Sequence, residues 1–387
     1  MWLELVDESA VKRREARMGY VDCDTHVIET AKTWDYMDPG EERLRPMMNG
    51  SRWNVEDLEM DWPTPMARKW QDVVFPGTDL VDIKARLKHM DDFGVDLQVL
   101  FPTWWLLYPV ASPAQEAAMY RSYNRWMAEG TADSGGRLRW AALAPVRRMD
   151  RAFEDLEYAK ENGAVSVFLL GQTHGLSLAD PTMFPLFAKA QDLDLTVTVH
   201  VGGDLRNSRR QPGNALHANM MTTPGAFFAL LWGRVMDKFP NLRWSFLEAG
   251  ASWVPYVLRE TFRADATGAF RSFRDWRDSA MEVIEGRKFT IACQVDDDIP
   301  YLTELLGPDV LIHGTDYGHL DLGADPDGMH VISNELGLDG DVARKIVDTN
   351  GRKAFGLDPA FNPAPAATVF DIPDEILAQG VPQLATQ

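Results

Sequence analysis

The chain has 387 residues, of which 45% are hydrophobic and 25% are charged, and these are the proportions of an ordinary globular protein. Its 58 acidic residues outnumber its 39 basic residues, and the net charge of −19 argues against nucleic acid or an anionic membrane as a partner. With two cysteines, no apolar N-terminal run and no long apolar span, the sequence predicts a cytoplasmic protein without disulfides.

The first predicted strand, residues 21–27, carries polar side chains toward its end. Side chains alternate along a strand, so Asp22, Asp24 and His26 are expected to share one face. Such groups are costly to bury unless they are paired or coordinated. The pattern predicts a site here, with Asp22 as a support, although a solvent-facing edge strand would also explain it. Residues 1–19 are expected to form a peripheral N-terminal segment.

Residues 31–77 show no clear period of 2 or 3.6 and are rich in Trp, Met and Pro. Long irregular insertions in compact domains are usually lids, binding loops or linkers, and the tryptophans favour burial. We interpret this insertion as a cap over the end of the first strand, with structural packing as the alternative.

From residue 80 onward, predicted helices alternate with short apolar strands. The further predicted strands are residues 95–101, 138–144, 165–170, 195–201, 242–247, 288–293 and 310–315. This alternation is typical of parallel βαβ units, and eight strands indicate an α/β fold of the (β/α)8 TIM-type barrel class. An open doubly wound sheet is the alternative, but the glycine-rich loop that often follows its first strand is missing. The barrel would span residues 20–356, and residues 357–387 would form a C-terminal surface tail.

Metal-binding kinds of residue follow four of the predicted strands, where a barrel collects its chemistry. They are Asp24 and His26 (strand one), His200 (strand five), Glu248 (strand six), and Asp316 and His319 (strand eight). Each alone is weak support for a site, but all would converge at one mouth. Imidazoles with two or three carboxylates suit a divalent transition metal such as zinc, manganese or iron.

These strand ends resemble the metal-dependent amidohydrolase superfamily, in its aminocarboxymuconate-semialdehyde-decarboxylase-like branch. The resemblance covers about residues 20–357. The motifs that carry it are Asp22-Cys-Asp24-Thr-His26, Thr198-Val-His200-Val-Gly202, Phe239-Pro-Asn-Leu-Arg243 leading to Glu248-Ala-Gly250, Gly314-Thr-Asp316-Tyr-Gly-His319, and the closing Asn350-Gly-Arg-Lys-Ala-Phe355.

The resemblance implies that four residues ligate the metal: Asp24, His26, His200 and Asp316. The family commonly has histidine where Asp24 stands, and many members have a strand-six histidine where this chain has Glu248. No lysine in strand four matches the one that bridges two metals in binuclear members. One ion is therefore the default expectation, although Glu248 could serve as a ligand to a second.

The leading hypothesis is a metal-dependent hydrolase that uses a metal-activated water on a small aromatic or apolar carboxylate or carbonyl compound. Asp316 would act as general base, Glu248 would transfer protons, and His319 would bind a substrate oxyanion. The alternatives are a non-oxidative metal-dependent decarboxylase, a mono- or di-iron oxygenase, and a non-catalytic binding barrel.

Four residues in the loops after the strands are weaker candidates for substrate binding. They are Trp104, His174, Arg206 and His217. Trp104 would contact an aromatic body and Arg206 a carboxylate, but exposed loop histidines and solvated arginines are common without any such role. The partner is expected to be a small molecule, and the resemblance makes a homo-oligomer plausible.

Overall fold

The computed structural model describes residues 19–49, 52–55, 58–61, 75–107, 112–203, 220–264, 284–319, 324–325 and 327–363. Apart from Gly19, the predicted N-terminal segment lies outside these residues, as does the tail beyond residue 363. The predicted substrate residues Arg206 and His217 also lie outside them.

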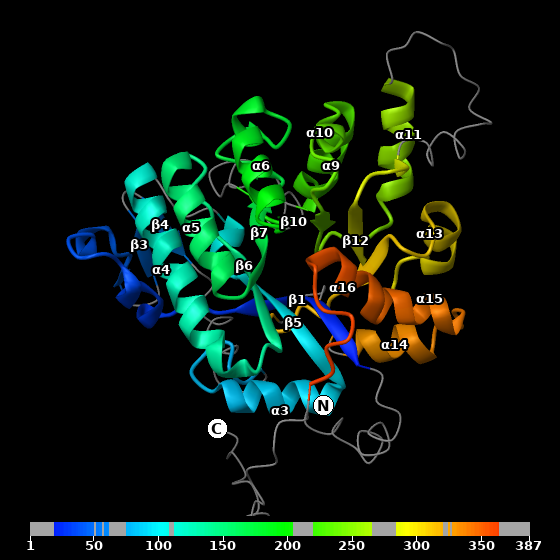
Figure 1. Cartoon of the computed structure of the whole chain (residues 1–387), viewed down its shortest axis with the longest axis horizontal. Coiled ribbons are helices and arrows are strands. Elements are labelled where there is room, and N and C mark those ends of the chain that lie inside the picture. The colour runs from blue at the N-terminus through cyan, green and yellow to red at the C-terminus, as the bar shows by residue number, and fades with distance from the viewer. Residues whose placement is uncertain are drawn as a thin grey trace, which may run out of the picture.

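Eight parallel strands form a nearly closed barrel, which confirms the predicted fold class (Figure 1). They are β1 (Tyr20–Val27), β5 (Val95–Pro102), β6 (Leu138–Ala142), β7 (Ala164–Leu170), β10 (Thr196–His200), β11 (Trp244–Phe246), β12 (Phe289–Cys293) and β13 (Leu311–His313). Each strand pairs with the next in chain order. All eight were predicted, because each is a short apolar run between helical segments.

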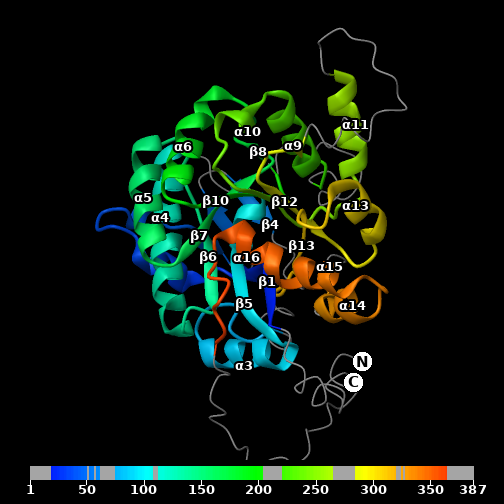
Figure 2. The same cartoon turned by 45° about the vertical axis from the view of Figure 1, so that its right-hand side comes forward.

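Helices surround the strands (Figure 2). They are α3 (Ile83–Phe93), α4 (Pro113–Thr131), α5 (Met149–Glu161), α6 (Phe184–Asp192), α9 (Thr222–Trp232), α10 (Val235–Lys238), α11 (Val254–Ala264), α13 (Ile299–Leu306), α14 (Gly328–Asn334), α15 (Gly340–Arg344) and α16 (Asn350–Phe355). In helix α3, the Asp82 side chain caps the first turn and Gly94 ends the helix in the left-handed conformation. None of the described helices is both long enough and apolar enough to cross a membrane.

The insertion after β1 is partly regular. It contains the 3-10 helices η2 (Ala31–Tyr36) and η3 (Glu42–Leu44) and a separate antiparallel sheet of β2 (Met47–Asn49), β3 (Arg52–Val55) and β4 (Leu58–Asp61). The short sheet was not predicted. Helix η2 packs on α4, where the Ser122 hydroxyl donates to the Thr33 carbonyl over 2.7 Å. Its role as a cap stays a prediction.

One end of the barrel is filled by α16. The Arg243 guanidinium donates to the Ala354 carbonyl over 3.0 Å, just before β11 begins. A Cβ on Gly351 would lie 2.5 Å from Cys23 Sγ, so only glycine lets this helix approach β1 so closely. Because α16 meets the beginnings of strands, the opposite end of the barrel is left for a site.

The barrel closes where the chain after β13 returns to β1. The His26 amide donates to the Tyr317 carbonyl over 2.6 Å, and the Asp316 amide donates to the Asp24 carbonyl over 2.9 Å. Gly314 lies between these strands, and a Cβ there would lie 2.2 Å from the Cβ of Asp24. Closure therefore depends on a missing side chain beside two of the candidate ligands.

Replacing Gly314 by alanine should lower the free energy of unfolding by about 1–3 kcal/mol, because the new methyl group forces β13 away from β1. Chemical denaturation measures this change. Gly225→Ala is the matched control, since a Cβ there meets nothing within 4 Å. The control should be neutral or slightly stabilising. A Gly314→Ala protein as stable as the control would contradict this account of closure.

The end of β1 is tied to the end of β5 by a buried carboxylate. Glu29 is 3% exposed, and its Oε2 accepts a hydrogen bond from the Trp104 amide over 3.1 Å. Burial raises the pKa of Glu29 from its ordinary 4.5 to about 8. The folded protein therefore holds a proton on this group that the unfolded chain releases at neutral pH.

Because of this proton, we expect the free energy of unfolding to depend on pH. Because the folded-state pKa is raised, the contribution of Glu29 is fully present below pH 4.5 and is lost as the pH rises toward 8. Glu29→Gln keeps the acceptor and cannot ionise. Between pH 5 and pH 9 the wild type should lose about 3–4 kcal/mol more unfolding free energy than this variant. Parallel pH curves in urea denaturation would rule the explanation out.

Candidate metal centre

Six polar side chains meet at the carboxyl ends of the strands, opposite α16. Asp24 and His26 come from β1, and His200 is the last residue of β10. Glu248 follows β11, and Asp316 and His319 follow β13. All six are buried, with Glu248 the most exposed at 7%. The structure thus brings together all the predicted metal ligands and the predicted catalytic residues.

His200 stands between two carboxylates. Its Nε2 lies 3.3 Å from Asp24 Oδ1 and 3.2 Å from Glu248 Oε2. His26 also lies between two carboxylates, because its Nε2 is 3.5 Å from Asp24 Oδ1 and 3.3 Å from Asp316 Oδ1. Two imidazoles and three carboxylates therefore form one continuous cluster.

The other ring nitrogen of each imidazole faces a backbone carbonyl. His26 Nδ1 lies 3.2 Å from the Pro102 carbonyl oxygen, and His200 Nδ1 lies 2.9 Å from that of Val201. A carbonyl oxygen only accepts, so Nδ1 carries the hydrogen in both rings. In the neutral rings, Nε2 then presents a lone pair to the carboxylates, which is the orientation of a metal-binding histidine.

The pKa values of the cluster residues are set by burial and by the neighbouring charges together. Burial alone would lower the pKa of His200, but the charges of Asp24 and Glu248 raise it to about 9. Burial opposes ionisation of Asp24, yet His200 and His26 hold its pKa well below the ordinary value. Burial and the neighbouring His319 lower the pKa of His26 to about 3.

Backbone strain aims two of the carboxylates into the cluster. Glu248 has φ 58° and Asp316 has φ 55°, in the left-handed region that side chains other than glycine seldom adopt. Such a conformation costs on the order of 1–3 kcal/mol and persists where the surrounding structure requires it. Four described non-glycine residues outside the cluster share this region, namely Leu80, His174, Asp194 and Arg234. The strain therefore supports a functional site only together with the donor geometry.

The donor atoms are close enough to share an ion. One atom each from Asp24, His26, His200 and Glu248 lie within 4.8 Å of one another, and the same is true of His26, Glu248, Asp316 and His319. Imidazole nitrogen and carboxylate oxygen suit zinc, manganese or iron. The residues therefore fit a divalent metal, which would also neutralise the buried carboxylates.

The predicted shared face of Asp22, Asp24 and His26 is wrong for Asp22. The pairing of β1 with β5 slips between Asp22, opposite Gln98, and Thr25, opposite Leu100, so three steps on β1 match two on β5. Such a bulge breaks the alternation that the prediction assumed.

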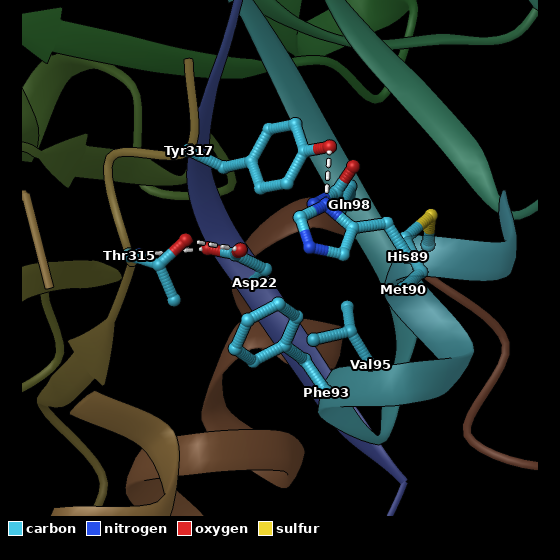
Figure 3. A pocket seen from close by; sticks show the side chains of 8 residues that line it. All are labelled: Asp22, His89, Met90, Phe93, Val95, Gln98, Thr315 and Tyr317. Atoms are coloured by element: carbon cyan, nitrogen blue, oxygen red, sulfur yellow. Dashed lines mark hydrogen bonds between the residues drawn. The ribbon is translucent and has the colours of Figure 1, made fainter. Parts of the chain in front are cut away.

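Asp22 is a structural support, as the sequence suggested. Its carboxylate accepts hydrogen bonds from the amide and hydroxyl of Thr315, at 2.9 and 2.6 Å. It shares a cavity of about 10 Å³ with His89 and Phe93 of α3 (Figure 3). Such a space is close to the smallest that holds one water molecule. Burial raises the pKa of Asp22 to about 7, so this group is partly protonated near neutral pH.

Sequence analysis missed two side chains that hold the ligands in place. Arg86 of α3 is fully buried, donates to the His26 carbonyl over 3.1 Å and stacks over the Tyr317 ring at 4.7 Å. Thr103 donates to the Val27 carbonyl over 2.8 Å and lies 3.0 Å from His319 Nε2. Neither belongs to a motif; an arginine on the apolar side of α3 was the only available signal.

Two weaker candidates lie outside the cluster. His174 Nε2 lies 2.8 Å from the buried Glu116 carboxylate at the start of α4. Trp104, in the 3-10 helix η4 (Trp104–Leu107), is 3% exposed and packs against Trp34 with ring centroids 5.7 Å apart. Their role in substrate binding stays a prediction.

Comparison with known proteins places this arrangement in a family. A family model described as Amidohydrolase matches residues 21–357. A 2-amino-3-carboxymuconate-6-semialdehyde decarboxylase of Dictyostelium discoideum is 23% identical over an alignment of 248 residues, and the alignment covers 61% of this chain. The matched stretch spans 66% of that relative, just under two thirds of its length.

Several solved structures share the fold. An amidohydrolase from Mycobacterium avium subsp. paratuberculosis has a TM-score of 0.71 at 18% identity, covering 89% of this chain and 99% of its own. A 5-carboxyvanillate decarboxylase from Sphingomonas paucimobilis has a TM-score of 0.65 at 17% identity, covering 88% and 100%. One from Novosphingobium aromaticivorans, with bound manganese, has a TM-score of 0.62 at 12% identity, covering 88% and 97%.

The family match runs from the second residue of β1 to two residues beyond α16 and so includes all eight barrel strands and all six cluster residues. The chain therefore belongs to the amidohydrolase family and is an enzyme of that superfamily.

Proposed function

We propose that this enzyme is a metal-dependent, non-oxidative decarboxylase of a small organic acid. The observation that carries the proposal is the buried cluster in which His26 and His200 both direct Nε2 at carboxylates. Relatives named as decarboxylases support carboxyl removal better than the hydrolysis that the sequence analysis ranked first. Hydrolysis and oxygenation stay alternatives for the same site.

Asp24, His26, His200 and Asp316 would hold the ion. A divalent metal bound there acts as a Lewis acid toward an oxygen of the substrate and stabilises developing negative charge. The hydrogen bonds from the two Nδ1 atoms to backbone carbonyls keep both rings in ligand orientation. Burial of the whole cluster keeps water away from these charges, which strengthens their interactions.

Decarboxylation breaks a carbon–carbon bond, releases carbon dioxide and leaves a carbanion that must receive a proton. Glu248 is the carboxyl group that we assign to this delivery. It lies beside His200 at 3.2 Å, and its strained backbone directs it into the cluster. Many family members place a histidine at this point, so the chemistry of proton transfer would be carried here by an oxygen acid.

Loss of a ligand should remove metal and activity together. For His26→Ala we expect a fall of at least about 100-fold in metal affinity and no measurable carbon dioxide release, because an inner ligand is lost. The variant is tested with Mn²⁺ and a panel of hydroxylated aromatic carboxylates. His330→Asn, on the surface beside Glu335, is the matched control and should behave as wild type.

The same assay separates the three reactions. Carbon dioxide release without oxygen supports the proposal. A product that carries ¹⁸O from labelled water, formed without release of carbon dioxide, would contradict decarboxylation and support hydrolysis. Oxygen consumption tied to product formation would support oxygenation instead.

Glu248→Gln should lower kcat by about 10²- to 10⁴-fold, because the amide keeps the shape but cannot deliver a proton. The ion assigned to Asp24, His26, His200 and Asp316 should be retained, because those four side chains are unchanged. In D₂O the wild-type product should carry one deuterium at the carbon that lost its carboxyl group. A kcat near that of wild type would remove Glu248 from the mechanism.

A further inference from the structure

We propose that His319 is a metal ligand and that it completes a second ion position with Asp316 and Glu248. The inference rests on the proposed function, because it assumes that the first position holds an ion. His319 differs from the other two histidines in the ring nitrogen that it presents. Its Nδ1, and not its Nε2, faces a carboxylate, at 2.8 Å from Asp316 Oδ1.

The tautomer of His319 follows from the hydroxyl of Thr103. That hydroxyl has one hydrogen, which it donates to the Val27 carbonyl over 2.8 Å. Toward His319 Nε2, 3.0 Å away, the oxygen can therefore only accept. Nε2 thus carries a hydrogen, and Nδ1 of the neutral ring presents its lone pair to Asp316.

This is the same arrangement that orients His26 and His200. In all three rings, one nitrogen donates to a fixed oxygen outside the cluster and the other points at a carboxylate inside it. A lone pair aimed at a carboxylate is repelled unless a cation lies between them. Thr103 would then be the positioning residue of His319, as the carbonyls of Pro102 and Val201 are for the other two rings.

The donor positions divide into two overlapping sets. Asp24 and His200 belong to one group of mutually close donor atoms, and Asp316 and His319 belong to the other; His26 and Glu248 belong to both. An imidazole nitrogen binds one ion, whereas a carboxylate has two oxygens and can serve two.

We therefore assign His26 to the first ion. The carboxylates of Asp316 and Glu248 would be available to both positions. Asp316 Oδ1 faces both His26 Nε2, at 3.3 Å, and His319 Nδ1, at 2.8 Å. Glu248 would contribute a carboxylate oxygen to the second position. The His26 and His319 rings stack with centroids 3.8 Å apart, so the two positions would be neighbours.

Metal stoichiometry tests the assignment without reference to turnover. The full chain is stripped of metal, reloaded with Mn²⁺ alone and desalted, and manganese per chain is measured by mass spectrometry. We expect two ions per chain in the wild type and an electron paramagnetic resonance spectrum of two coupled Mn²⁺ ions. His319→Phe keeps the ring stack but has no donor nitrogen, so it should bind one ion and lose the coupling.

Thr103 provides a second pair of variants that does not alter any ligand. Thr103→Val removes the hydroxyl at nearly constant volume and should weaken binding of the second ion by about 10- to 100-fold. Thr103→Ser keeps the hydroxyl and should restore two ions. His330→Asn is again the matched control and should bind two.

The outcomes separate this inference from the proposed function. One ion per chain in both the wild type and His319→Phe would mean that His319 only forms an ion pair with Asp316. That result overturns the second position and leaves the first intact. Two ions in His319→Phe would also overturn it. A wild-type protein that binds no ion would contradict the proposed function itself.

Discussion

The constraint on which this structure depends is buried negative charge at the mouth of the barrel. Asp24, Glu248 and Asp316 all lie within a few ångströms of imidazole nitrogens and away from water. Burying ionised carboxylates without compensation is costly. His26 and His200 have already committed their Nδ1 hydrogens to backbone carbonyls, so a cation supplies the missing charge most directly. The charges of Asp24 and Glu248 also raise the pKa of His200 to about 9.

The rest of the fold keeps this charge in place. The chain after β13 closes onto β1 through backbone hydrogen bonds that include Asp24 and Asp316, and Gly314 gives it room to do so. The Arg86 guanidinium donates a hydrogen bond to the His26 carbonyl and also stacks on the Tyr317 ring. The left-handed conformations of Glu248 and Asp316 store strain that this packing maintains. Closure of the barrel and formation of the site are thus one structural event.

The strands and the clustered polar residues could be predicted from the sequence because both leave local signals. A short apolar run followed by His200 or by Asp316 indicates a buried strand with a potential metal-binding side chain at its end. The bulge at Asp22 and the strain at Glu248 have no such signal, since they depend on neighbouring strands. Thr103 and Glu29 act through long-range hydrogen bonds, which no spacing along the chain indicates. The cytoplasmic location and the homo-oligomer stay predictions.

The reaction turns on whether the cluster holds a cation, and crystals grown with Mn²⁺ answer this most directly. Anomalous diffraction near the manganese edge should place an ion about 2.0–2.3 Å from His26 Nε2 and His200 Nε2, the usual range for such bonds. Absence of anomalous density there, with both imidazoles still beside the carboxylates, would contradict a metal-dependent enzyme.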